Sequence, residues 1–86
     1  MKSILRYLNS LENCRATNVS GDAKKSGEPD IDGCFRGRCL KFEVKRPGGK
    51  GATPLQEEVL SMWREAGAIA EVVRSKEDVK ALIERG

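Results

Sequence analysis

Residues 39–45 (CLKFEVK) place the strongest constraint on how this chain folds. Apolar and polar side chains alternate along them, which is typical of a β-strand with one buried face. Leu40, Phe42 and Val44 belong to the apolar face. The opposite, polar face carries Cys39, Lys41, Glu43 and Lys45. The glycine-rich residues 47–51 (PGGKG) interrupt the pattern, so the strand ends there and a new element must begin after it.

A helix and another strand follow this interruption. Thr53 suits a helix N-cap and Pro54 the first helical position, while Gly67 is typical of the residue just beyond a helix end. Residues 68–74 (AIAEVVR) then predict a strand. A strand–helix–strand unit of this kind has parallel strands and a right-handed crossover. We expect the buried stripe of the helix to be Leu55, Val59, Met62, Trp63 and Ala66.

The remaining elements complete a small α/β domain. Residues 20–28 are polar without periodicity and predict a loop, and Arg36-Gly37 predicts the turn of a hairpin. The order is therefore α-β-β-β-α-β-α, which favours a mixed sheet flanked by helices in a single domain, residues 1–86. The outer helices are expected at residues 3–12 and 76–84, and the first two strands at residues 14–19 and 30–35.

The chain contains no histidine, which limits the chemistry open to it. Catalytic triads, histidine acid–base catalysis and histidine-bound zinc are excluded within this chain. Its three cysteines lack CxxC spacing, so reduced structural thiols are favoured over disulfide bonds or a zinc site. No apolar stretch approaches the roughly 18 residues of a membrane span, and the N-terminus lacks the apolar core of a signal peptide. We therefore expect a cytoplasmic protein with no membrane partner.

The positive charge is concentrated in one segment. The chain has 16 Lys+Arg and 13 Asp+Glu, a formal net charge of +3. Residues 35–50 contain six basic side chains and a single acid, Glu43, so the whole excess lies there. A basic stripe suits a polyanion such as nucleic acid. On charge alone, a solvated surface hairpin explains the same pattern slightly better.

Three ionisable residues form the constellation that best indicates chemistry. Glu43 and Lys45 are two residues apart on one expected strand, so they share a face. Counting outward from the turn at Arg36-Gly37 places Asp30 opposite Glu43. Two facing carboxylates repel unless a divalent cation binds between them, and a neighbouring lysine can hold a hydroxide or a phosphate oxygen. The E-x-K pattern alone is commonplace on exposed strands, where it serves solubility and cross-strand pairing.

Three motifs of this chain resemble those of the VRR-NUC domain of the PD-(D/E)XK nuclease superfamily. They are Gly27-Glu28-Pro29-Asp30, Phe42-Glu43-Val44-Lys45 and Pro54-Leu55-Gln56. The resemblance continues through Ala66-Gly67-Ala68 into residues 75–79, so it covers almost the whole chain. It implies a restriction-endonuclease-like core, and the expected element order is similar to that of this superfamily.

The same resemblance implies a nuclease that depends on Mg²⁺ or Mn²⁺. It implies Asp30 and Glu43 as metal ligands, the carbonyl of Val44 as a third ligand, and Lys45 as the catalytic lysine. It also implies Gln56 as a site residue. Independently, the pattern T-x-x-Q ending at Gln56 predicts a capping box, and both roles are compatible.

Four further residues are candidates for contacts with nucleic acid. Arg15 and Asn18 match the polar first strand of the family, although surface polarity explains them as well. Arg46 and Lys50 belong to the basic stretch and its glycine loop, which are expected to flank a DNA backbone. The family usually has a glutamate on or before the first helix, and no acid precedes Ile4 here. Three alternatives stay open: water completes the metal shell, Glu12 substitutes, or the N-terminus has been trimmed.

The resemblance implies cleavage of DNA with a particular structure. Small freestanding members look like phage or prophage proteins, which places the expected activity in a bacterial or phage-infected cell. Symmetric cutting of a four-way (Holliday) junction needs two active sites, hence a two-fold homodimer. The first helix, the last helix and Trp63 are candidate dimer surfaces, with a core position favoured for Trp63. The alternative is a nucleic-acid-binding module with the same fold that either does not cut or needs a partner to do so.

Overall fold

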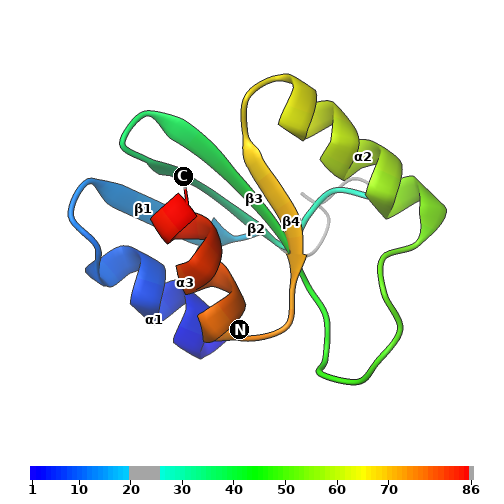
Figure 1. Ribbon diagram of the computed structural model, residues 1–86, viewed down its shortest axis with the longest axis horizontal. Helices are drawn as coiled ribbons and strands as arrows, with labels where there is room; N and C mark the ends of the chain where they lie inside the picture. Colours follow the sequence, from blue (N-terminus) through cyan, green and yellow to red (C-terminus); the bar gives the residue numbers. More distant parts are fainter. Residues whose placement is uncertain (20–25, 86) are drawn as a thin grey trace.

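The computed structural model describes residues 1–19 and 26–85, which form three helices and a four-stranded sheet (Figure 1). The sheet order is β1-β2-β3-β4, with antiparallel pairing of β1 to β2 and β2 to β3, and parallel pairing of β3 to β4. The expected α/β class, mixed sheet and parallel strand pair are confirmed. The elements are α1 (Lys2–Ser10), β1 (Cys14–Asn18), β2 (Ile31–Phe35), β3 (Arg38–Val44), α2 (Pro54–Glu65), β4 (Ile69–Val73) and α3 (Lys76–Arg85).

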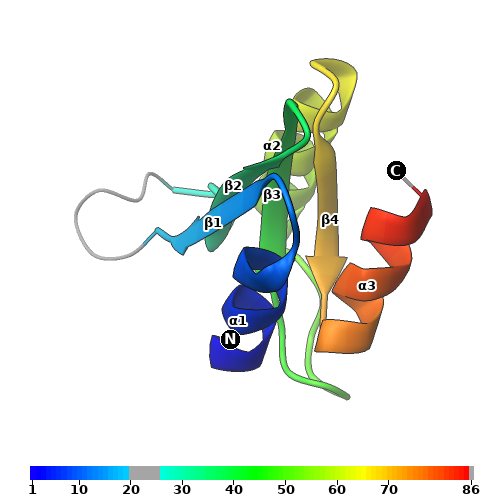
Figure 2. The ribbon, with the colours of Figure 1, turned by 90° about the vertical axis from the view of Figure 1, so that its left-hand side faces the viewer.

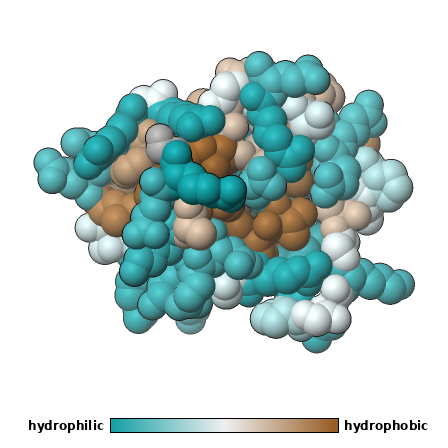
Figure 3. All heavy atoms as spheres, viewed as in Figure 1, coloured by the Kyte–Doolittle hydropathy of each residue, from teal (hydrophilic) through white to brown (hydrophobic). Residues whose placement is uncertain are grey.

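Helices cover both faces of the sheet. Figures 1 and 2 show α1 and α3 together on one face and α2 on the other, over β3 and β4. In the view of Figure 1, hydrophilic side chains cover most of the surface and hydrophobic ones show in the gaps between them (Figure 3). The larger core cluster lies between the sheet and the α1–α3 pair. Its fully buried members include Leu8, Ile31, Leu40, Phe42, Val73 and Val79.

The hairpin of β2 and β3 has the register expected from its turn. Arg36 and Gly37 both have positive φ, of 51° and 86°, a combination required by the type I′ turns that suit twisted hairpins. Phe35 accordingly pairs with Arg38. Side chains of β3 also alternate as expected, because Leu40 and Phe42 are buried in the larger core cluster while Lys41 and Glu43 lie on the opposite face, toward α2.

The buried stripe expected for α2 is partly wrong. Thr53 forms the expected capping box, but Leu55 and Met62 are 47% and 61% exposed, and Ala66 is exposed as well. The fully buried residue is Leu60, which packs with Ala70 of β4, with Ala68 just before this strand, and with Trp63. The helix is rotated toward the face of Val59, Leu60 and Trp63, since small alanines beneath it leave room for these larger side chains.

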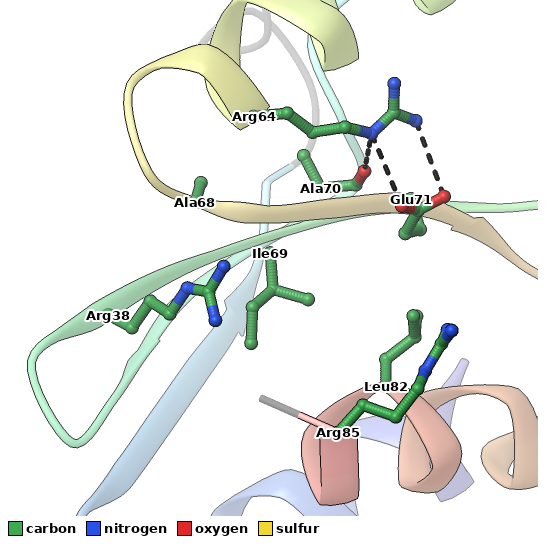
Figure 4. Close-up of a pocket in the computed structure, with 8 residues that line it drawn as sticks. All are labelled: Arg38, Arg64, Ala68, Ile69, Ala70, Glu71, Leu82 and Arg85. Carbon is green, nitrogen blue, oxygen red and sulfur yellow. Dashed lines mark hydrogen bonds and ion pairs between the residues drawn. The ribbon is translucent and has the colours of Figure 1, made fainter.

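Side chains form hydrogen bonds with backbone groups on both edges of the sheet. On β1, the Asn9 amide accepts a hydrogen bond from the Ala16 N–H at 2.9 Å and donates one to the Ala16 carbonyl at 3.0 Å. On β4, Arg64 Nε donates to the Ala70 carbonyl at 2.7 Å (Figure 4), and Asp78 accepts from the Arg74 N–H at 2.8 Å just after the strand. These contacts use groups that another strand would need to extend the sheet.

Two further expectations concern the loop at residues 20–28 and the absence of a membrane span. The loop expected over residues 20–28 lies outside the described residues up to residue 25, and only residues 26–28 of it are described. Among the helices of the two described ranges, none combines the length and the apolar character required to cross a bilayer.

Candidate active site

Asp30 and the end of β3 meet as the hairpin count predicts. Ile31 pairs with Phe42, so the preceding residue, Asp30, lies across from Glu43. The side chain of Asp30 is anchored there, because its Oδ2 accepts a hydrogen bond from the Val44 N–H at 3.0 Å. The two carboxylates that the sequence singles out therefore come from neighbouring strands and lie at the same end of the sheet.

Glu43 and Lys45 form an ion pair at this end of the sheet. Glu43 is only 3% exposed, and its Oε2 lies 3.7 Å from Nζ of Lys45. The Lys45 side chain retains 23% of its exposure, so the pair lies at the boundary between interior and solvent. The Lys45 N–H also donates to the Val73 carbonyl at 3.0 Å, which ties the lysine to β4. A buried carboxylate is costly unless a cation or hydrogen bonds compensate it.

The donor set at this end of the sheet fits a hard divalent cation. Asp30 and Glu43 supply carboxylate oxygens, which Mg²⁺ and Mn²⁺ prefer, whereas thiolate and imidazole ligands for zinc do not lie beside them. Within residues 1–19 and 26–85, no group of three Asp, Glu, Cys or His side chains is close enough to form a metal cage. A cation held here would therefore keep several waters, as Mg²⁺ usually does, in addition to the expected Val44 carbonyl.

The capping role of Gln56 is confirmed. Its Oε1 accepts from the Thr53 N–H at 2.9 Å, while its own N–H donates to Thr53 Oγ1 at 3.2 Å. The role of Gln56 in the site stays a prediction. Because the capping box uses Oε1, a contact of this side chain with substrate would involve its amide Nε2.

The four residues expected to contact nucleic acid do not form one patch. Arg15 and Asn18 are both exposed, but they are three positions apart on β1 and so point to opposite faces of the sheet. Arg46 and Lys50 are exposed on the loop that follows Lys45. The sequence did not single out Arg74, whose Nη1 donates to the carbonyls of Arg46 and Gly49 at 2.6 and 3.2 Å and braces this loop.

Glu12 does not take the place of the missing upstream glutamate. It lies between α1 and β1, next to the strand start at Cys14, which pairs with Phe35 at the far end of β2. Asp30 precedes the near end of that strand, roughly 16 Å away at the usual rise per strand residue. Glu12 is therefore too distant to bind a cation together with Asp30.

The structure shows a polar cluster beside the site that the sequence did not single out. Lys41 Nζ lies 2.6 Å from Asp32 Oδ1 and 3.9 Å from the centre of the Trp63 ring. The Trp63 indole N–H donates in turn to Glu28 Oε2 at 3.1 Å. Counting outward from the hairpin turn pairs Asp32 with Lys41, so this contact could have been found. The Glu28 contact depends on where α2 packs, which no local pattern specifies.

The cysteines lie away from the carboxylates. All three are free thiols; Cys34 and Cys39 are exposed and face each other across the hairpin. Burial, and secondarily the neighbouring Cys34, raises the pKa of Cys14 above its usual value. Less thiolate at neutral pH makes Cys14 a weak nucleophile.

A pocket of about 370 Å³ lies at the other end of β3 and β4 (Figure 4). Arg38, Arg64 and Arg85 line it, and none of the candidate site residues does. Arg38 donates to the Gly67 carbonyl at 3.0 Å, and Arg64 is bonded to Ala70 and Glu71, so two of these arginines hold backbone and strand edge in place. This pocket is therefore separate from the paired carboxylates.

The fold and the site define a small α/β protein with two carboxylates and a lysine at one end of a mixed sheet. Comparison of the chain with family models, with curated proteins and with solved structures finds no match. The arrangement of Asp30, Glu43 and Lys45 is therefore the main indication of what this protein does.

Proposed function

We propose that this protein is a Mg²⁺- or Mn²⁺-dependent endodeoxyribonuclease, similar to VRR-NUC domains of the PD-(D/E)XK superfamily. It hydrolyses phosphodiester bonds in branched DNA such as Holliday junctions, and it acts as a homodimer. One observation carries the proposal: Asp30 bonds to the Val44 N–H across from buried Glu43, which is ion-paired with Lys45. Paired carboxylates followed by a lysine suit phosphodiester hydrolysis in a chain that has no histidine.

The residues of the site divide the work by their chemistry. Asp30 and Glu43 would hold the cation, which when bound polarises the phosphoryl group and lowers the pKa of its water. The hydrogen bond from the Val44 N–H fixes the orientation of the Asp30 carboxylate before substrate arrives. The Lys45 ammonium, held beside Glu43, offsets negative charge that develops on the phosphate in the transition state.

Charge and loop geometry support a DNA substrate. The basic excess of the chain lies in residues 35–50, which include β3 and the loop after Lys45. Arg46 and Lys50 are exposed on this loop, and Arg74 holds its backbone in place. Exposed cations beside a hydrolytic site neutralise the phosphates on either side of the cut bond.

Cleavage of a labelled four-way junction tests the proposal. We expect cutting with Mg²⁺ or Mn²⁺ and none with EDTA. Lys45→Ala should lose cutting by at least about 100-fold, the usual cost of removing a transition-state charge contact, while junction binding survives. The control is Lys80→Ala, which removes an exposed lysine from α3 and should cut normally.

Two results would overturn the assignment. Equal cutting by the Lys45→Ala variant would remove the catalytic role of this lysine. Tight, salt-sensitive junction binding by the wild-type chain without any metal-dependent cutting would favour the alternative, a nucleic-acid-binding module with the same fold.

A further inference from the structure

The segment that carries Asp30 is held against α2 at several points. Gly27 has a positive φ of 82°, and a Cβ placed on it would lie 2.8 Å from Leu55 Cγ and 3.2 Å from Val59 Cγ2. A side chain there would collide with the helix, so the backbone of residue 27 lies directly on α2. Pro29, which immediately precedes Asp30, is buried.

Glu28 adds a polar contact to the same helix. Its Oε2 accepts a hydrogen bond from the Trp63 indole N–H at 3.1 Å. Leu55, Val59 and Trp63 are spaced four residues apart, so they form one row along α2. Residues 27 and 28 therefore lie along this row. At its C-terminal end, the contact is the directional hydrogen bond from the Trp63 indole to Glu28.

Trp63 is fixed from the sheet side as well. The Lys41 ammonium lies 3.9 Å from the centre of its ring and is also ion-paired with Asp32 at 2.6 Å. Lys41 precedes Glu43 by two residues on β3, and Asp32 follows Asp30 by two residues along β2. The Asp32–Lys41 pair is thus the next same-face pair of the hairpin after Asp30 and Glu43. The indole connects the strand of Glu43 to the segment that leads into Asp30.

We propose that Glu28 and Trp63 are positioning residues that set where the Asp30 carboxylate lies relative to Glu43 and Val44. Neither is proposed as a ligand of the cation. Their hydrogen bond holds the approach to Asp30 on α2, while the Asp30 peptide carbonyl, which accepts from the Val19 N–H at 2.7 Å, holds the other side. With both sides held, the Asp30 side chain meets the Val44 N–H without reorganisation. The consequence for cation binding rests on the proposed function, whereas the geometric role does not.

Hydrogen exchange of the Val44 amide in the metal-free chain of residues 1–86 tests the geometric role directly. This amide donates to Asp30 Oδ2, so its protection reports whether Asp30 is in place. Trp63→Phe keeps a ring beneath Lys41 and removes the N–H donor. We expect the free energy of exchange at the Val44 amide to fall by more than the free energy of global unfolding does. For the amides of α3, the two free energies should fall by the same amount.

Variants at Glu28 separate the hydrogen bond from general loss of packing. Glu28→Gln retains a carbonyl acceptor for the indole N–H and should preserve Val44 protection, whereas Glu28→Ala should lower it as Trp63→Phe does. Met62→Leu is the matched control, because Met62 neighbours Trp63 on α2 but is 61% exposed. If Val44 protection changes only in step with global stability in Trp63→Phe and Glu28→Ala, the positioning role is wrong.

Calorimetric titration with Mn²⁺ tests the consequence for the cation. Loss of a residue that orients a ligand typically weakens metal binding by about 10- to 100-fold, and we expect this for Trp63→Phe and Glu28→Ala. Unchanged Mn²⁺ affinity in both variants, with normal binding by the wild type, would overturn the inference and leave the proposed function intact. A wild-type chain that binds no Mn²⁺ would instead remove the proposed function, while the Val44 exchange result would still decide the positioning role.

Discussion

Glu43 carries a carboxylate that is almost completely buried. At 3% exposure it has lost most of its hydration, and its Oε2 lies 3.7 Å from the Lys45 ammonium, which is itself partly in water. Burial of a charge in this way usually destabilises a fold relative to a neutral residue of the same shape. Retaining a carboxylate at such a place is typical of a site where stability is exchanged for function.

Glu43→Gln should separate these two roles. The variant keeps the side-chain shape and removes the charge, so we expect the metal-free protein to unfold at a temperature no lower than that of the wild type. In the wild type, Mn²⁺ at about 100 times its Kd should stabilise the fold by about 2.7 kcal/mol, and this increment should vanish in the variant.

Thermal unfolding followed by circular dichroism, with and without Mn²⁺, measures both quantities. Glu65→Gln is the control, since Glu65 is exposed at the end of α2 and its loss should leave the Mn²⁺ increment unchanged. A Glu43→Gln variant that Mn²⁺ still stabilises as much as the wild type would show that Glu43 is no ligand.

Features of an element that neighbouring residues determine can be predicted from the sequence. Features that depend on packing between distant residues cannot. The two-residue turn at Arg36-Gly37 determines the hairpin register, so the approach of Asp30 to Glu43 could be predicted by counting. The rotation of α2 could not be predicted, because the burial of Leu60 instead of Met62 depends on the alanines at and just before the start of β4 that pack against it. The Glu28–Trp63 hydrogen bond joins residues far apart in sequence and depends on that rotation.

The edge of β1 makes a separate prediction at the level of elements. Asn9 satisfies both the N–H and the carbonyl of Ala16, and Asn9→Ala leaves these two part-buried groups without their side-chain partner. We expect the free energy of unfolding in urea to fall by about 1–3 kcal/mol. Asn9→Asp should fall between, because it keeps an acceptor for the N–H and loses the donor to the carbonyl.

The control for this prediction is Ser10→Ala, which removes an exposed hydrogen bond from the same helix to the Tyr7 carbonyl. Its effect should stay within about 0.5 kcal/mol, as for most surface substitutions. If Asn9→Ala and Ser10→Ala unfold at the same urea concentration, the Asn9 side chain does not stabilise the strand edge.

The whole molecule is small for the task proposed, and its edges limit how two copies can associate. Backbone groups of Ala16 on β1 and of Ala70 on β4 are already bonded to side chains. Continuing the sheet through either edge would break these bonds, so a homodimer is expected to associate through helices instead. A two-fold dimer of this kind would bring two of the proposed sites to one junction, one for each strand to be cut.

A plasmid that extrudes a cruciform distinguishes paired from single cutting. A wild-type homodimer should cut both strands in one binding event and convert the supercoiled plasmid to the linear form. Adding excess Lys45→Ala chains should form mixed dimers with one working site, so the product should shift from linear to nicked plasmid in proportion to the excess. Replacing these chains with Lys80→Ala at the same excess should leave the linear product unchanged, because every dimer then keeps two working sites.

Light scattering at the same protein concentration should give twice the mass of one chain. A monomeric mass, together with linear product that Lys45→Ala chains do not reduce, would show that one chain cuts both strands independently and would end the paired-site model.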